Sequence, residues 1–150
     1  MRKSKIIIPE KTCFETTITI QVGDLNYGGH VGNERYLLFA QETRIRFLQS
    51  LGYSEMKFGP YGLVLSDATI EYLHELFHGD QISIMMSIAN ISKASFDCYY
   101  SLSTSENNAH KAIARIMTTM ICYDYTARKV RSIPEEIKAK LLQVAAHPGC

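Results

Sequence analysis

The stretch from Asn33 to Leu51 constrains the fold more than any other part of the sequence. It contains no Gly or Pro, and Gly52 stands where a glycine commonly ends a helix. Its first half, residues 36–40, is apolar on nearly all sides, which is typical of a buried helix. We therefore expect one long internal helix with Asn33 as its N-cap residue.

Strands are predicted on both sides of this helix by alternating and β-branched residues. One strand is expected before it, at 12–22, and four after it, at 63–73, 81–91, 95–103 and 111–125. Residues 106–108 are expected to turn the last hairpin, and a short C-terminal helix is expected from Pro134, as its first residue, to about Ala145. This order predicts an α+β fold in which an antiparallel sheet curls around one long central helix.

Length and charge limit the class of protein. A chain of 150 residues with ordinary composition is expected to form a single domain over residues 1–150, with enough core to fold without disulfides or metal. The formal net charge is +1, and no basic stripe is interleaved with aromatic residues, so the sequence argues against a nucleic-acid partner.

The cysteines and the N-terminus favour a cytoplasmic protein without a membrane partner. The four cysteines are widely spaced along the sequence and form no CxxC pair, which is typical of proteins in a reducing compartment. The apolar run at residues 6–8 stops at Pro9 and is too short for a signal peptide, and no run approaches the length of a membrane span.

A glycine-rich turn at residues 23–33 connects the first strand to the helix. A helix start presents free N–H groups and a partial positive charge, which suit a carbonyl oxygen or an anion. The N–H groups of Gly32 and Asn33 are therefore candidates for polarising a carbonyl. His30 titrates near neutral pH in its free form, so it is a candidate general acid or base, although it can equally fix the turn by hydrogen bonds.

The whole pattern resembles the hotdog-fold thioesterases, in particular the 4-hydroxybenzoyl-CoA thioesterase-like acyl-CoA thioesterases. The family pattern, Asp-x-Asp-x-x-Gly-His-Val-Asn-Asn-x-x-Tyr followed by Glu-x-Arg and Phe-Leu, spans the turn and the helix. The residues in register are Asp24, Gly29, His30, Val31, Asn33, Tyr36, Glu42, Arg44, Phe47 and Leu48. Ile70-Glu71-Tyr72 and Gly79-Asp80 match a later strand and turn of the family, so the resemblance covers about residues 12–125.

One departure concerns the catalytic aspartate of the family, whose position is occupied by Asn26. An amide cannot accept a proton as a general base or attack as a carboxylate, although it can hold a water or a thioester by hydrogen bonds. Asp24, Glu42 and Asp67 are the candidate replacements. Asp67 is expected on the strand face that carries Leu63 and Leu65, an unfavourable place for a charge without a role.

The resemblance implies an acyl-CoA thioesterase, acting on a fatty or aromatic acyl-CoA, that forms a homodimer or a dimer of dimers with sites at the subunit interface. Glu42 lies about 13 Å along the helix from Asn33, so it would reach the helix start most easily from a second subunit. In this scheme Asn26 and His30 orient substrate or water, and Glu42 supplies the base. Thioester hydrolysis of this kind needs no metal or organic cofactor.

Other readings of these residues remain open. Asp24 and Asn26 can simply bond local backbone, and Glu42 can form a surface ion pair with Arg46. The chain can also be a non-catalytic acyl-CoA or acyl-carrier binding module, as the loss of the aspartate suggests, or a hotdog dehydratase acting on 3-hydroxyacyl thioesters.

A zinc peptidase is the remaining alternative. Residues 74–78 fit the HExxH pattern, which requires a helix to project both histidines from one face. Here the pattern follows a predicted strand and runs into Gly79-Asp80, so we expect a strand end that enters a turn.

Overall fold

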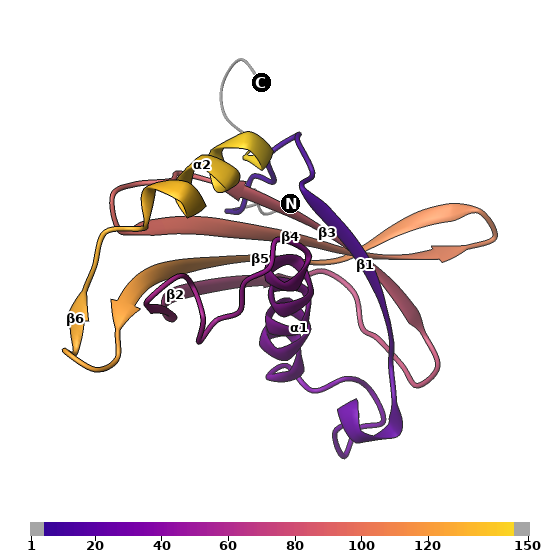
Figure 1. The fold of residues 1–150 in the computed structure, drawn as a ribbon. Helices are drawn as coiled ribbons and strands as arrows, with labels where there is room; N and C mark the ends of the chain where they lie inside the picture. Colours follow the sequence, from indigo (N-terminus) through magenta and orange to yellow (C-terminus); the bar gives the residue numbers. More distant parts are fainter. Residues whose placement is uncertain (1–4, 146–150) are drawn as a thin grey trace.

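The computed structural model describes residues 5–145 (Figure 1). Its elements are β1 (Phe14–Thr19), a 3-10 helix η1 (Val22–Asp24), α1 (Arg35–Ser50), β2 (Gly62–Tyr72), β3 (Gln81–Ala89), β4 (Ser95–Glu106), β5 (Ala109–Asp124), β6 (Lys129–Val130) and α2 (Glu135–Val144). The predicted α+β class is confirmed, as is the order of a strand, a long helix and four further strands. There are two helices in the described chain, of which α1 is the longer.

The six strands form one antiparallel sheet in the order β1-β3-β4-β5-β2, with β6 paired to β5. The consecutive strands β2 and β3 are therefore not neighbours, because β2 crosses to pair with β5. The β4–β5 hairpin turns through Asn107 and Asn108, whose φ angles of 50° and 64° are those of a two-residue turn that matches the twist of the strands. In this strand order, the long strand β2 lies at one edge of the sheet.

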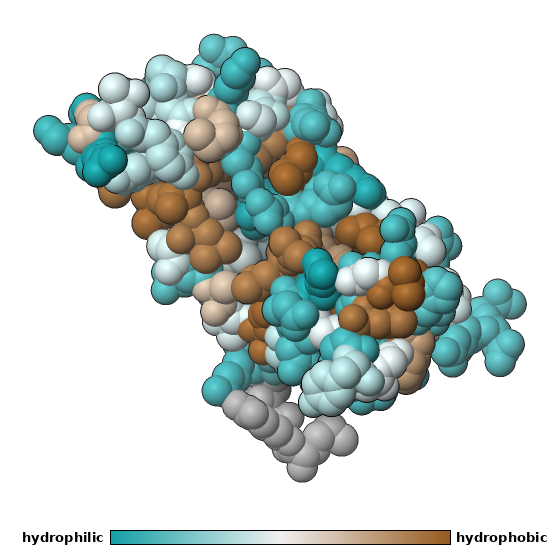
Figure 2. All heavy atoms as spheres, turned by 90° about the horizontal axis from the view of Figure 1, so that it is seen from below, coloured by the Kyte–Doolittle hydropathy of each residue, from teal (hydrophilic) through white to brown (hydrophobic). Residues whose placement is uncertain are grey.

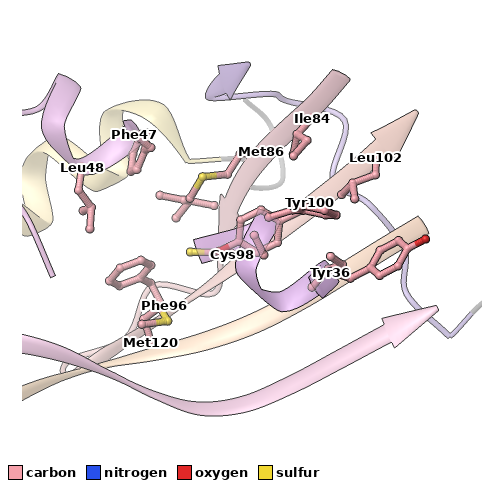
Figure 3. Close-up of a cluster of buried hydrophobic side chains, with 14 of the residues drawn as sticks. Tyr36, Phe47, Leu48, Ile84, Met86, Phe96, Cys98, Tyr100, Leu102 and Met120 are labelled. Atoms are coloured by element: carbon pink, nitrogen blue, oxygen red, sulfur yellow. The ribbon is translucent and has the colours of Figure 1, made fainter. Parts of the chain in front are cut away.

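Helix α1 packs its apolar side against the sheet (Figure 3). Phe47 meets Phe14 of β1 with ring centroids 5.9 Å apart, and the buried side also carries Phe39, Ala40 and Leu48. At its C-terminus, Gly52 adopts a φ of 87° and Tyr53 N–H donates to the Leu48 carbonyl, so the predicted glycine stop is confirmed.

The expectation that the first half of α1 is buried all round is wrong for the isolated chain. Leu37 and Leu38 are 38% and 46% exposed, because the sheet covers only one side of the helix. The helix start also differs from the prediction: its N-cap is Glu34, and Asn33 precedes it. At the other helix, Pro134 occupies the N-cap position and α2 begins one residue later.

A buried arginine joins α1 to the sheet and to the loop that follows the helix. Arg44 is 4% exposed, its Nε donates to Glu55, and its Nη1 donates to the Tyr100 hydroxyl at 3.0 Å. The Tyr100 hydroxyl also lies 3.1 Å from Thr118 Oγ1 on the neighbouring strand. A buried charge is tolerated when its donors are paired in this way. The network therefore fixes α1 over β4 and β5.

A β-bulge in β2 overturns the prediction for the position of Asp67. The register shifts between Leu65, opposite Met120, and Asp67, opposite Thr119. Because successive residues of a strand point to opposite faces, the extra residue Ser66 moves Asp67 off the face shared by Leu63 and Leu65. Asp67 is exposed on the side away from α1, where its carboxylate accepts a hydrogen bond from Ser66.

Cys13, Cys98 and Cys122 are free thiols, and burial raises the pKa of Cys13 to about 11 and of Cys98 to about 12. The fourth cysteine, Cys150, lies outside the described residues. Neither helix between residues 5 and 145 has the length and apolar character required to cross a membrane.

Tyr100→Phe tests the buried arginine network. The change leaves Arg44 Nη1 without its hydroxyl acceptor inside the core, which should lower the free energy of unfolding by about 1–3 kcal/mol. Urea unfolding measures the loss. Tyr123→Phe is the matched control, since the Tyr123 hydroxyl has no hydrogen-bond partner within residues 5–145. Equal stability of the two variants would contradict the role given to the network.

Candidate active site at the start of helix α1

The glycine-rich turn forms a small hairpin of its own. Leu25 pairs with Val31 in an isolated antiparallel bridge, and Asn26 N–H donates to the His30 carbonyl at 2.9 Å. The turn closes through Gly29, whose N–H donates to the Asn26 carbonyl and whose φ of 80° favours glycine. The sequence therefore folds residues 25–31 into a rigid loop just ahead of α1.

This hairpin docks on the segment that follows β2. Val31 N–H donates to the Leu76 carbonyl at 2.9 Å, and His30 bridges to Phe77. Val31 and Leu76 are 2% and 0% exposed, so an apolar contact accompanies the backbone bond. The Tyr72 hydroxyl adds a hydrogen bond of 2.9 Å to the Asn33 carbonyl. Two segments far apart in the sequence thus form one surface at the helix start.

A cavity of about 250 Å³ opens where these segments meet. Its walls come from the hairpin, the first turn of α1 and the segment after β2: His30, Val31, Asn33, Tyr36, Tyr72, Leu73, His74 and Glu75. A larger open groove of about 640 Å³ lies elsewhere, along β1, β3 and the β4–β5 hairpin. Its walls are mostly hydroxyl side chains, and it includes none of the residues predicted from the sequence, so we place the candidate site at the smaller cavity.

The helix start provides fewer free donors than the sequence suggested. Gly32 N–H donates to the Asp24 carbonyl at 3.1 Å and is already used. Across residues 5–145, the N–H of Asn33 has no acceptor. A Cβ at Gly32 would meet only the flexible end of the exposed Glu34 side chain, so sterics alone do not require glycine here. Of the two predicted carbonyl-polarising donors, the Asn33 N–H is therefore the one that is free within the described residues.

Asp24 and Asn26 both brace the turn. Asp24 Oδ2 accepts from the Gln21 N–H at 2.9 Å, and its carbonyl accepts from Gly32. Asn26 Oδ1 accepts from the Gly28 N–H at 2.8 Å, which is the local backbone bonding common for asparagine in turns. The Asn26 amide oxygen is thus occupied in forming the hairpin.

His30 lies at the cavity with one ring nitrogen bonded and one free. Its Nδ1 is 3.2 Å from the Val31 carbonyl, and its Nε2 is 4.0 Å from Glu75 Oε1. Tyr36 and Tyr72, which also line the cavity, meet edge to face with ring centroids 5.0 Å apart. Burial, with smaller effects of Tyr72 and Glu75, raises the pKa of Tyr36 to about 12, so its hydroxyl stays protonated and can donate.

The two remaining predicted carboxylates do not lie at this cavity. Glu42 is exposed on α1 and pairs with Arg46 at 3.6 Å, as the surface-pair reading expected. Asp67 faces away from α1, beyond the bulge in β2. The structure therefore brings together His30 and Asn33 at the cavity, with Asn26 and Gly32 supporting them from the turn.

The HExxH segment is not helical. It leaves β2 and enters the turn at Gly79, as predicted, and His74 Nδ1 lies 2.7 Å from the Ala112 carbonyl. No group of three or more His, Cys, Asp or Glu side chains in the described part of the chain is arranged to hold a metal ion. The helical arrangement that a zinc peptidase of this type requires is therefore missing.

Exposed apolar side chains gather around this part of the molecule. Figure 2 shows hydrophobic patches on the side of the molecule where α1 lies. Some of the large exposed apolar residues lie on α1, β2 and the segment after β2: Leu37, Leu38, Leu65, Tyr72, Leu73 and Phe77. Such a concentration is typical of an interaction surface.

The chain belongs to the Thioesterase-like superfamily, whose model matches residues 20–141. The match includes the glycine-rich turn, α1 and the whole sheet except β1. A curated relative is the 1,4-dihydroxy-2-naphthoyl-CoA hydrolase of Microcystis aeruginosa (strain NIES-843 / IAM M-2473). It is 30% identical over 82 residues, which are 55% of this chain and 56% of that protein. The chain therefore matches little more than half the length of this relative.

Solved structures of hotdog-fold thioesterases share the architecture. A 1,4-dihydroxy-2-naphthoyl-CoA thioesterase from Synechocystis superposes with a TM-score of 0.78 at 23% identity, covering 90% of this chain and 98% of that one. A gentisyl-coenzyme A thioesterase gives 0.74 at 19% identity, covering 85% and 99%. These similarities establish the fold.

The sequence did not predict that Tyr72, His74 and Glu75 line the cavity. Tyr72 was visible in the family pattern only as a strand residue, and Glu75 only as the centre of HExxH. Their place beside His30 follows from the backbone pairing of residues 30–31 with 76–77, which no local sequence pattern reveals.

Asn26→Ala tests the structural role of the amide. Losing the acceptor for the Gly28 N–H should lower the free energy of unfolding by about 0.5–1.5 kcal/mol, measured by urea unfolding. Asn26→Asp is the matched control, because a carboxylate keeps the acceptor and should cost less. The same loss in both variants would show that the side-chain bond to Gly28 does not hold the turn.

Proposed function

We propose that the protein is an acyl-CoA thioesterase that hydrolyses its substrate at the start of α1. The observation that carries the proposal is the cavity that both Asn33, whose N–H has no acceptor within residues 5–145, and His30 line. Membership of the Thioesterase-like superfamily and the name of the curated hydrolase relative support a CoA thioester as the substrate. The aromatic walls, Tyr36 and Tyr72, favour an aromatic acyl group over a simple fatty chain.

The chemistry follows from the helix start. The thioester carbonyl accepts a hydrogen bond from the Asn33 N–H, and the partial positive charge of α1 stabilises the oxyanion that forms when water attacks. His30 lines the same cavity, where it orients or activates the water. Asn26 acts through the turn that holds His30 and does not act as a base itself.

We also propose that the functional unit is a homodimer in which α1 is the central helix of a hotdog fold. The exposed leucines of α1 and the open edge of β2 are surfaces that a second copy of the chain would cover. Such a dimer would place two helix starts beside a shared interface and give the CoA arm a channel between subunits. A dimer of dimers is compatible with the same contacts.

Glu42 can reach this cavity only if it comes from a second copy of the chain. Its carboxylate lies about 13 Å along α1 from Asn33. The general base is then supplied either across the interface, by Glu42, or within the chain, by a group at the cavity.

The alternative is a non-catalytic acyl-CoA binding module, favoured by the engagement of Asn26 in the turn. Turnover separates the two functions. We expect the purified protein to release free thiol over many turnovers from an aromatic acyl-CoA, such as benzoyl-CoA or 1,4-dihydroxy-2-naphthoyl-CoA, and more slowly from palmitoyl-CoA. Tight binding of these compounds with recovery of the intact thioester would instead support the binding module.

Leu38→Glu tests the dimer. A charge at this exposed apolar position should oppose burial against a second copy, so sedimentation equilibrium should give a monomer mass for the variant and at least a dimer mass for the wild type. Leu142→Glu is the control, because Leu142 is similarly exposed (44%) but lies on α2. A monomeric wild type, or a variant that stays dimeric, would remove this face from the interface.

A further inference from the structure

Glu75 is the carboxylate residue that lines the cavity beside His30. Glu75 belongs to the segment whose backbone pairs with the hairpin through Val31 and Leu76. Its side chain is exposed (65%) at the rim of the cavity, and its Oε1 lies 4.0 Å from His30 Nε2. It is therefore the carboxylate at the cavity that faces His30, and it comes from the same chain.

The tautomer of His30 follows from its other nitrogen. Nδ1 lies 3.2 Å from the Val31 carbonyl, which can only accept a hydrogen bond, so Nδ1 carries the proton. In the neutral ring, Nε2 then presents a lone pair toward the Glu75 carboxylate. Gly28 leaves room for this ring position, because a Cβ there would lie 3.2 Å from Nε2.

A neutral Nε2 and a carboxylate oxygen are both acceptors and cannot hydrogen-bond to each other, and their separation of 4.0 Å leaves room for a bridging donor. A water molecule fits this requirement, since one of its protons can go to Nε2 and the other to Oε1. The lone pairs of the water then remain free to attack an electrophile. This arrangement stands at the cavity that also holds the Asn33 N–H.

We infer that Glu75 and His30 together hold and activate the attacking water of the thioesterase reaction. This inference rests on the proposed function. His30 Nε2 takes one proton of the water as its oxygen bonds to the thioester carbon, and Glu75 stabilises the imidazolium that results. The oxyanion collapses, the carbon–sulfur bond breaks, and the thiolate of CoA takes the proton from His30. The products are the free acid and CoA, and both side chains return to their starting states.

Four variants test this pairing with an aromatic acyl-CoA as substrate: His30→Asn, Glu75→Gln, their double variant, and Glu75→Asp. We expect Glu75→Gln to lower kcat on the order of 10- to 100-fold with KM within about threefold, and Glu75→Asp to recover part of the rate. The double variant should be no slower than His30→Asn alone, because the two groups act on one water. Glu135→Gln on α2 is the control and should match the wild type, and thermal unfolding checks that every variant is folded.

The outcomes separate this inference from the proposed function. A wild type that hydrolyses acyl-CoA while Glu75→Gln keeps its kcat would overturn the inference alone. So would multiplicative losses in the double variant. Glu42→Gln is measured alongside, and a loss of kcat confined to this variant would also overturn the inference, because it would place the base on a second subunit. A wild type without turnover on any acyl-CoA would overturn both.

Discussion

The candidate site depends on one backbone contact, the hydrogen bond from Val31 to Leu76. It joins the hairpin before α1 to the segment after β2, and both residues are buried in the core. Because the contact excludes water, the hydrogen bond holds its geometry. The backbone of the residues next to Val31 and Leu76 is therefore held in place as well. His30 and Glu75 each lie next to a residue of this bond, so the backbone brings the two side chains to the same cavity.

The buried network around Arg44 plays the corresponding role at the other end of the helix. Through Glu55 and Tyr100 it ties α1 to the following loop and to the sheet. The docked hairpin holds the start of α1, and the Arg44 network holds its C-terminal half. The helix therefore cannot move along the sheet without breaking the contacts of the hairpin or of the network. A helix start that stabilises an oxyanion needs such rigidity, since a displacement of about 1 Å weakens the interaction strongly.

Most of the fold could be predicted from the sequence because short local patterns of residues determine most of its helices and strands. The alternation in β5, the absence of Gly and Pro in α1 and the glycine at position 52 each act over a few residues. Predictions failed where one residue changed a register or where tertiary contacts decided: Ser66 turned Asp67 to the far face, and the sheet left Leu37 and Leu38 uncovered. For the site, the turn was found, but its partner segment was not, because pairing between residues distant in sequence leaves no local pattern.

Asn26 is compatible with catalysis if a carboxylate at this position has two separate functions, which are to form the turn and to provide negative charge. The hydrogen bond to Gly28 requires only a side-chain oxygen two residues before the N–H, which an amide supplies as well as a carboxylate. In the reaction we propose, the negative charge faces the histidine, and Glu75, 4.0 Å from His30 Nε2, would supply it from another segment. A change from aspartate to asparagine therefore removes charge from the turn without disturbing its shape. The consequence is that the family pattern alone is a poor guide to whether this chain is active, and that the residues at the cavity decide it.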